Sequence, residues 1–164
     1  MLSILFLCTG NSGRSILAEA LMNRLGEGRF KAYSAGSAPK GEVNPHVFPA
    51  TRALGFPDDA FHSKPWEAFA GEGAPKLDFV ITVCDHVADE ACPIWPGQPI
   101  SAHWGIADPA RVGRETGFAA AFAAAEAQLR GRIERLLALP VDRLDRPTLQ
   151  ARLREIGAES GEGG

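Results

Sequence analysis

The chain begins with an apolar run, a loop of small polar residues and an amphipathic segment, and this order restricts the fold more than any later part. Leu2–Leu7 is almost entirely apolar, as is typical of a central parallel strand covered on both faces. Arg14–Leu25 then places apolar residues at helical spacing, and Gly26 follows as a stop signal. We therefore expect a strand that enters a helix through the loop at residues 8–13, the repeating unit of α/β domains.

The remainder of the chain repeats this alternation. We expect strands at Phe30–Ala35, Leu77–Val83 and Pro99–His103, and helices at Pro45–Leu54, in part of Phe61–Phe69, at Glu115–Leu139 and after Pro140. This pattern predicts an α/β domain with a mainly parallel sheet, in which ligands bind beyond the carboxyl ends of the strands. Cys8, Cys84 and the loop HWGIADP at residues 103–109 all follow predicted strands, so we expect them to share one crevice.

Length and charge narrow the possible functions. With 164 residues the chain is suited to one compact domain, and a net charge of −3 from 17 basic and 20 acidic residues does not favour nucleic acid as a partner. The apolar run MLSILFL has no basic flank and is too short for a signal peptide or a membrane span, so we expect a cytoplasmic protein without a membrane partner. Three widely spaced cysteines indicate reactive or buried thiols rather than a disulfide framework.

The loop CTGNSGRS, residues Cys8–Ser15, carries the most specific chemistry in the sequence. A loop of small residues before a helix can turn its backbone N–H groups inward, and the helix N-terminus adds partial positive charge. The expected oxyanion cradle consists of Thr9, Gly10, Asn11, Ser12, Gly13 and Arg14. Arg14 offers a permanently charged fork that suits a tetrahedral oxyanion, and the same field favours the thiolate of Cys8, which becomes a nucleophile.

Four other loop residues have roles that their chemistry suggests. Gly10 and Gly13 permit the unusual dihedrals of a tight loop, and Asn11 can either tie the loop to itself by hydrogen bonds or adopt a left-handed conformation. Ser15 can donate a hydrogen bond to the sulfur of Cys8. The alternative, a buried strand-end thiol beside a solvated arginine, fits a lone cysteine better than this combined pattern. No lysine follows the loop glycine, so the motif is not a nucleotide-binding P-loop.

A zinc site is the main competing interpretation of the later cysteines. Cys84, His86, Cys92 and His103 are all possible ligands, but their spacing matches none of the usual zinc patterns. We therefore expect no metal centre.

The chain resembles the low-molecular-weight protein tyrosine phosphatase superfamily and, within it, the arsenate reductases. The resemblance spans roughly residues 2–139 and rests on CTGNSGRS, the following LAEAL, SAGS at 34–37, the strand end VITVC, the pair Cys92-Pro93 and HWGIADPA. It implies a three-layer α/β/α sandwich with a four-stranded parallel sheet. It also implies a phosphatase-like catalytic domain at residues 1–139, with residues 140–164 as a helical extension and flexible tail of the same domain.

The resemblance implies that Cys8 attacks the central atom of an oxyanion and that Asp108, in the pair Asp108-Pro109, acts as general acid. An in-line displacement needs a proton for the leaving oxygen, and an aspartate at a strand end can deliver it. Taken alone, an Asp-Pro pair is usually only a turn. Phosphatases of the superfamily usually have a second loop cysteine and a proline after the serine, whereas this chain has Gly13 and Ile16. Ala110 and Arg111, rather than aromatic residues, follow Asp108-Pro109.

The reductases of the superfamily add two redox cysteines after the third strand, and Cys84 and Cys92 lie in the matching segment. The implied cycle is a thiol relay: Cys8 attacks arsenate, Cys84 attacks Cys8 and releases arsenite, and Cys92 attacks Cys84. The resulting Cys84–Cys92 disulfide is then reduced by an external thiol such as thioredoxin, glutaredoxin or glutathione. No tightly bound cofactor is implied, and arsenate, phosphate or sulfate is expected in the loop of a monomeric enzyme.

Two departures from the family pattern bear on the partners. Seven residues separate Cys84 from Cys92, one more than in typical thioredoxin-linked members, so glutaredoxin or a small thiol remains an alternative donor. Many of those members bind potassium near the loop through residues matching Asn11, Glu19 and Ser34, with an acidic residue where this chain has Lys64. The lysine suggests that its ammonium replaces the ion. A phosphatase acting through a Cys8 phosphocysteine, and an oxyanion sensor without turnover, are the other functions that this sequence allows.

Overall fold

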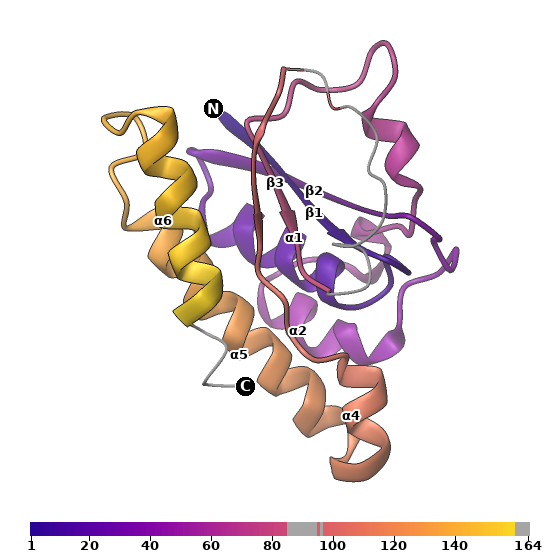
Figure 1. Cartoon of the computed structure of the whole chain (residues 1–164). Helices are drawn as coiled ribbons and strands as arrows, with labels where there is room; N and C mark the ends of the chain where they lie inside the picture. Colours follow the sequence, from indigo (N-terminus) through magenta and orange to yellow (C-terminus); the bar gives the residue numbers. More distant parts are fainter. Residues whose placement is uncertain (85–94, 96, 160–164) are drawn as a thin grey trace.

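The computed structural model describes residues 1–84, 95 and 97–159, and its core is a four-stranded sheet. The strands are β1 (Leu2–Cys8), β2 (Phe30–Gly36), β3 (Phe79–Thr82) and β4 (Ile100–His103). All neighbouring strands run parallel, in the order β2-β1-β3-β4 (Figure 1). The predicted α/β fold with a four-stranded parallel sheet is therefore confirmed.

Strand β1 lies in the middle of the sheet because its residues can be buried on both faces. Ile4–Cys8 is buried throughout, and the strand pairs with β2 on one side and β3 on the other. The register places Cys8 opposite Gly36 of β2 and Leu7 opposite Thr82 of β3. Cys8 and Cys84 are thus brought to the same edge of the sheet, as we expected from their positions after strands.

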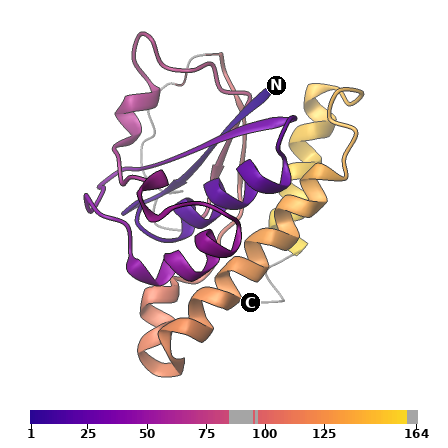
Figure 2. The ribbon, with the colours of Figure 1, turned by 180° about the vertical axis from the view of Figure 1, so that it is seen from behind.

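Helices cover one face of the sheet. Figure 2 shows α1 (Arg14–Leu25), α2 (Phe48–Ala53) and α5 (Phe118–Leu137) on that side. Three short 3-10 segments, η1 (Pro45–Val47), η2 (Asp58–Ala60) and η3 (Trp66–Phe69), lie in the connections. The ring of Phe69 on η3 lies 5.4 Å from that of Tyr33 on β2, so η3 covers part of the opposite face.

The helix expected at Glu115–Leu139 is wrong in extent, because the structure divides this region into α4 (Pro109–Thr116) and α5. Gly117 separates the two helices with φ of +97°, a left-handed conformation that favours glycine at a helix end. Helix α4 is not among the predicted helices, and it begins at Pro109 because Asp108 caps it and the proline occupies its first position.

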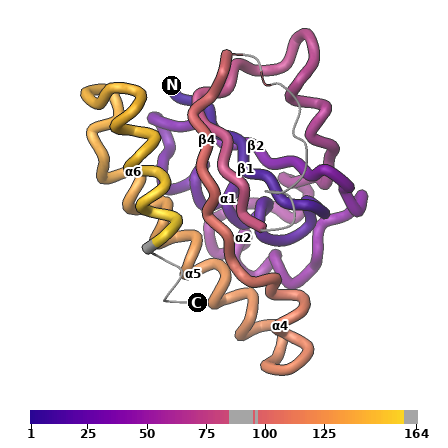
Figure 3. Tube along the Cα trace, viewed as in Figure 1, coloured from indigo at the N-terminus to yellow at the C-terminus, as the bar shows by residue number. Residues whose placement is uncertain are grey.

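Helix α6 (Arg146–Glu159) follows α5 and packs along β4, beside the sheet (Figure 3). The indole N–H of Trp104 donates to the carbonyl of Leu153 at 2.9 Å, and Gln150 donates to the carbonyl of Ser101 on β4. A Cβ at position 157 would lie 2.3 Å from the carbonyl oxygen of His103, so only glycine permits this approach. Among the described residues, no helix is both long and apolar enough to cross a membrane.

Candidate active site

The loop between β1 and α1 is held from outside by the chain segment that follows β2. Three backbone hydrogen bonds join them: Ala38 N–H to Thr9 O at 2.9 Å, Lys40 N–H to Gly10 O at 3.0 Å and Asn44 N–H to Ser12 O at 2.9 Å. A trans peptide directs its C=O and N–H to opposite sides, so these outward carbonyls turn the next N–H groups inward. The loop therefore presents several N–H groups to its interior, as an oxyanion cradle requires.

The close approach of β2 to this loop depends on Gly36. A Cβ at that position would lie 2.5 Å from the carbonyl oxygen of Thr9 and 3.0 Å from the backbone nitrogen of Asn11. Gly36 is not among the predicted site residues, although a glycine at the end of a predicted strand signals close backbone contact.

Asn11 realises both of the roles that we considered for it. Its backbone is left-handed, with φ of +44°, and its side chain is fully buried. The amide nitrogen Nδ2 donates to Ser15 Oγ at 2.8 Å and to Ser34 Oγ at 3.0 Å, and Oδ1 accepts from the Lys64 N–H at 2.8 Å. Every polar atom of this side chain is therefore engaged, which fixes an otherwise strained backbone.

Cys8 lies at the base of the cradle and is 3% exposed. Its sulfur accepts a hydrogen bond from the Asn11 N–H at 3.2 Å and lies 2.8 Å from Ser15 Oγ. Because Ser15 Oγ already accepts from Asn11, its own hydrogen is available for the sulfur. Two donors therefore converge on one sulfur, which is the acceptor at the base of the cradle.

The polar network extends from Asn11 away from the cradle. Ser34 Oγ donates to Glu19 Oε1 at 2.5 Å, and that carboxylate oxygen lies 3.9 Å from Lys64 Nζ, which also donates to the carbonyl of His62. Burial raises the pKa of Glu19, although Lys64 and the Ser34 hydrogen bond act in the opposite direction. Burial likewise lowers the pKa of Lys64 against the attraction of Glu19. The structure thus brings together the three supporting residues named from the sequence.

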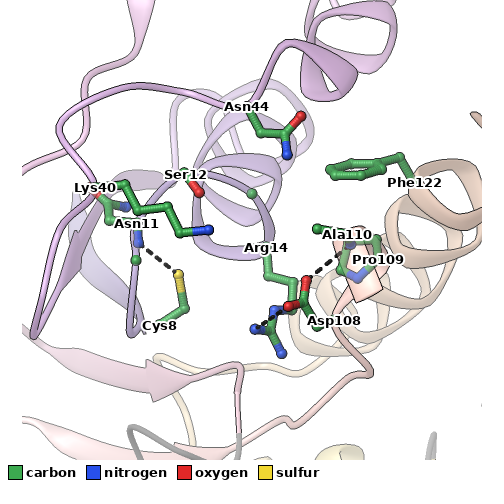
Figure 4. Close-up of a pocket in the computed structure, with 12 residues that line it drawn as sticks. Cys8, Asn11, Ser12, Arg14, Lys40, Asn44, Asp108, Pro109, Ala110 and Phe122 are labelled. Carbon is green, nitrogen blue, oxygen red and sulfur yellow. Dashed lines mark hydrogen bonds and ion pairs between the residues drawn. The ribbon is translucent and has the colours of Figure 1, made fainter. Parts of the chain in front are cut away.

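Arg14 and Asp108 face each other across the mouth of the cradle. Arg14 Nη1 donates to the carbonyl of Ile106 at 3.0 Å, and Nη2 lies 4.0 Å from Asp108 Oδ2. The other oxygen of Asp108 accepts from the Ala110 N–H at 3.0 Å, which caps α4. Together with Cys8 they line a cavity of about 120 Å³ (Figure 4).

The cavity wall includes three residues that sequence reasoning missed: Lys40, Asn44 and Phe122. Each comes from a segment remote from the loop, and none belongs to a motif. Phe122 lies within the helix predicted at Glu115–Leu139, and it is almost fully buried. No local signal distinguishes it from a core residue.

Cys84 lies two residues beyond β3, is 2% exposed and has its sulfur 3.5 Å from Thr9 Oγ1. A second thiol therefore lies against the loop that carries Cys8. Both cysteines are free of disulfides. Cys92 and His86 lie outside the described residues, so the structure gives no account of the relay pair or of the zinc alternative.

One other candidate zinc ligand is described. His103 Nδ1 lies 2.7 Å from Thr82 Oγ1. Across residues 1–84, 95 and 97–159, no group of three His, Cys, Asp or Glu side chains is arranged to hold a metal ion.

The family assignment follows from this fold, this loop and the comparison with known proteins. Residues 3–139 match the family model described as low molecular weight phosphotyrosine protein phosphatase. The chain belongs to this family. An arsenate reductase of Halalkalibacterium halodurans is 38% identical over 108 residues, which are 66% of this chain and 74% of that protein. An arsenate reductase of Bacillus cereus is 39% identical over 108 residues, 66% of this chain and 77% of that protein.

Solved structures agree with this assignment. One of them, an arsenate reductase in the phosphate binding state, has a TM-score of 0.67 at 28% identity, and the match covers 84% of this chain and 98% of that one. A thioredoxin-dependent arsenate reductase of Corynebacterium glutamicum has a TM-score of 0.57 at 25% identity. That match covers 83% of this chain and 59% of the Corynebacterium protein.

Proposed function

We propose that this chain is an arsenate reductase that uses Cys8, Cys84 and Cys92 as a thiol relay. The observation that carries the proposal is the position of Cys84, whose sulfur lies 3.5 Å from Thr9 Oγ1 in the loop beyond Cys8. A phosphatase needs only the cradle and a general acid, whereas a reductase needs a second thiol next to the first. The arsenate reductases among the relatives support this choice.

In the first step the Cys8 thiolate attacks arsenic, and one arsenate oxygen leaves as water after protonation. Asp108 is the proposed proton donor, and Arg14 with the loop N–H groups holds the remaining oxygens. Ser15 stabilises the thiolate before attack and whenever Cys8 leaves again. The product is a Cys8 sulfur–arsenic(V) adduct.

In the second step the Cys84 thiolate attacks the Cys8 sulfur. A disulfide forms between the two cysteines, and the electron pair of the sulfur–arsenic bond passes to arsenic, which leaves as arsenite. Cys92 then attacks Cys84, which forms the Cys84–Cys92 disulfide and restores the Cys8 thiolate. Two thiols are oxidised for each arsenic reduced, so the electrons come from thiols and the relay requires no bound cofactor.

An external dithiol, or two monothiols, must then reduce the Cys84–Cys92 disulfide. Because the Corynebacterium relative is thioredoxin-dependent, thioredoxin is the first donor to test, while the spacing of the two cysteines keeps glutaredoxin and small thiols as alternatives. Because the thiols must be reduced between turnovers, the proposed enzyme works in a reducing compartment such as the cytoplasm. We propose that it does so as a monomer, since all three cysteines belong to one chain.

The test is to measure arsenite formation with thioredoxin, glutaredoxin and glutathione systems, in the wild type and in Cys84→Ser and Cys92→Ser. Both variants should lose multiple-turnover reduction but keep the hydrolysis of p-nitrophenyl phosphate. If no donor supports arsenite formation while the phosphate ester is hydrolysed, the alternative holds. The chain is then a phosphatase acting through a Cys8 phosphocysteine, which the matched family model also favours.

A further inference from the structure

Lys40 is a cation in the cavity wall to which the proposed relay gives no role. It lines the cavity with Cys8 and Arg14, and Figure 4 shows its side chain extended across the mouth with the ammonium directed into the cavity. Lys40 is exposed, so its ammonium can contact an incoming ligand before the ligand reaches the base of the cradle.

The backbone at Lys40 is fixed on the anion loop. Its N–H donates to Gly10 O at 3.0 Å, the next N–H, of Gly41, donates to Ser63 Oγ at 3.1 Å, and Ser63 Oγ donates to Gly10 O at 3.2 Å. Gly41 has φ of +87°, so the chain turns directly after the lysine. These contacts place the root of the side chain at a constant position beside the cradle.

The stem of Lys40 lies where a side chain at position 10 would otherwise be. A Cβ built on Gly10 would lie 3.2 to 3.4 Å from the Cγ, Cδ and Cε atoms of the lysine. Gly10 therefore makes room for the lysine stem, in addition to any freedom it gives the loop backbone. The aliphatic stem of Lys40 therefore lies along the loop.

Three cations in or beside the loop differ in their partners. Lys64 pairs with Glu19 and donates to a backbone carbonyl, and Arg14 donates to the carbonyl of Ile106 while facing Asp108. Within the described part of the chain, no carboxylate lies within ion-pair distance of Lys40. Its ammonium, which is directed into the cavity, can therefore contact a ligand without breaking an ion pair to a described residue.

The charges of the cavity indicate which ligand needs this second cation. With Cys8 as the attacking thiolate, the cavity holds one negative charge beside the carboxyl group of Asp108, and Arg14 supplies one positive charge. An incoming dianion adds two more negative charges, in a partly buried space where charges are weakly screened. A singly charged oxyanion adds only one negative charge and therefore gains less from a second cation.

We propose that Lys40 is a substrate-binding residue that makes the cavity prefer doubly charged tetrahedral oxyanions over singly charged ones. The proposal rests on the proposed function for its substrate, arsenate, but it concerns binding and not the redox steps. Inorganic phosphate and sulfate, which share the shape and charge of arsenate, therefore test it without turnover.

The experiment measures how phosphate and sulfate protect Cys8 from alkylation by iodoacetamide, a neutral reagent, with the modified peptide quantified by mass spectrometry. The concentration that gives half protection is compared in wild type, Lys40→Gln, Lys40→Arg and the control Lys76→Gln. Lys76 is exposed and precedes β3, at the other end of the sheet. We expect Lys40→Gln to weaken sulfate protection about tenfold, the size of one lost charge-assisted contact, with little change in the other two variants.

Charge preference is tested by repeating the phosphate series below and above the second ionisation of phosphate, which falls near neutral pH. The loss in Lys40→Gln should be larger above this ionisation, whereas the loss for sulfate, a dianion throughout, should stay constant. Equal losses for the two charge forms of phosphate overturn the proposed preference, and unchanged protection by sulfate overturns the proposal as a whole.

The packing of the stem gives an independent check. Gly10→Ala should displace the Lys40 stem and weaken sulfate protection in the wild-type background, but should have little further effect when Lys40→Gln is already present. Additive losses contradict this coupling. If arsenate is never reduced but the sulfate results are as expected, the proposed function fails while the role of Lys40 stands. If arsenate is reduced but Lys40→Gln leaves sulfate protection unchanged, the role of Lys40 fails while the proposed function stands.

Discussion

Two cysteines lie at the ends of neighbouring strands in this protein, equally buried but in different surroundings. Cys8 accepts a hydrogen bond from the Asn11 N–H, lies 2.8 Å from the Ser15 hydroxyl and shares a cavity with Arg14. Cys84 has one described polar neighbour, the hydroxyl of Thr9, at 3.5 Å. Burial alone therefore does not decide how a thiol reacts, and the donors around the sulfur do.

The difference suggests an order of events. In the proposed relay Cys8 acts first, because its sulfur lies in the cavity that receives the oxyanion and is contacted by two donors. In the same proposal Cys84 attacks second, because its target, the Cys8 sulfur, becomes an electrophile only when it carries a leaving group. The arsenic adduct proposed on Cys8 supplies that leaving group, and without it two thiols form no disulfide unless another oxidant is present.

Replacing each cysteine by serine tests the different roles of Cys8 and Cys84 most directly. Cys8→Ser should abolish both arsenate reduction and p-nitrophenyl phosphate hydrolysis, by about 10⁴-fold or more, because the nucleophile itself is lost. Cys84→Ser should still give one adduct per Cys8 with arsenate, seen as blocked alkylation of Cys8. Phosphatase activity that survives in Cys8→Ser would remove this residue from the proposed mechanism.

The Ser15 hydroxyl is the contact that most sharply separates the two sulfurs. Ser15→Ala should slow both activities roughly 100-fold, because Cys8 loses a donor both as nucleophile and as leaving group. The rate of Cys8 alkylation should fall with it, while that of Cys84 should not change. Equal alkylation rates of Cys8 in variant and wild type would contradict this role.

The Glu19–Lys64 pair supports the Cys8 side through Asn11 and Ser34. Lys64→Met should lower the free energy of unfolding at neutral pH by about 1–3 kcal/mol, because Glu19 keeps a buried charge without its counter-charge. Burial already raises the pKa of Glu19, and the variant raises it further. A raised carboxyl pKa favours the folded state at low pH, so part of the lost stability should return as pH falls towards the usual glutamate range.

Urea unfolding at several pH values measures this effect. The control is the double variant Glu19→Gln with Lys64→Met, which buries no charge at either position and should show no such pH dependence. A loss in Lys64→Met that is equal at every pH would mean that packing of the lysine, and not its charge, is responsible.

The hydroxyl of Thr9 is the corresponding contact on the Cys84 side. Thr9→Val should slow arsenate reduction a few-fold and leave p-nitrophenyl phosphate hydrolysis nearly unchanged, since the contact is long and neutral. Steady-state rates of the two reactions give the comparison. A larger fall in ester hydrolysis than in reduction would place Thr9 in the first step instead.

Potassium should have the smallest effect of all. The ammonium of Lys64 lies 3.9 Å from Glu19 Oε1, next to Ser34 and Asn11, where the family resemblance places the ion in other members. Replacing sodium by potassium at constant ionic strength should therefore leave arsenate reduction unchanged. Strong, saturable activation by potassium would show that the lysine does not substitute for the ion.

The first strand, loop and helix could be predicted almost residue by residue, because their signals are local. The apolar run, the small residues and the helical spacing from Arg14 to Leu25 all lie within one short segment, and the helix bounds agree with the prediction. The strand expected at Leu77–Val83 is shorter in the structure, since pairing with β1 and β4 and not apolar content sets its ends.

The site residues that were not predicted come from segments far from the loop in the sequence. Lys40, Asn44 and Phe122 reach the cavity from two segments whose packing no periodicity reports. Helix α4 was missed for a different reason. The sequence prediction gives Asp108 the role of general acid, yet the pair Asp108-Pro109 is also a helix-capping signal. The aspartate serves the cap with one oxygen and faces Arg14 with the other.

The packing of α6 on β4 shows that the end of the family match is not the end of the folded unit. The family match ends at residue 139, but the indole of Trp104 is fully buried and bonded to Leu153, and Gly157 lies against the strand that leads to the Asp108 loop. A protein truncated after residue 139 would leave this indole without its hydrogen-bond partner and would leave β4 as an edge strand open to pairing with other copies. The smallest portion to express for any of these assays therefore extends at least to the end of α6.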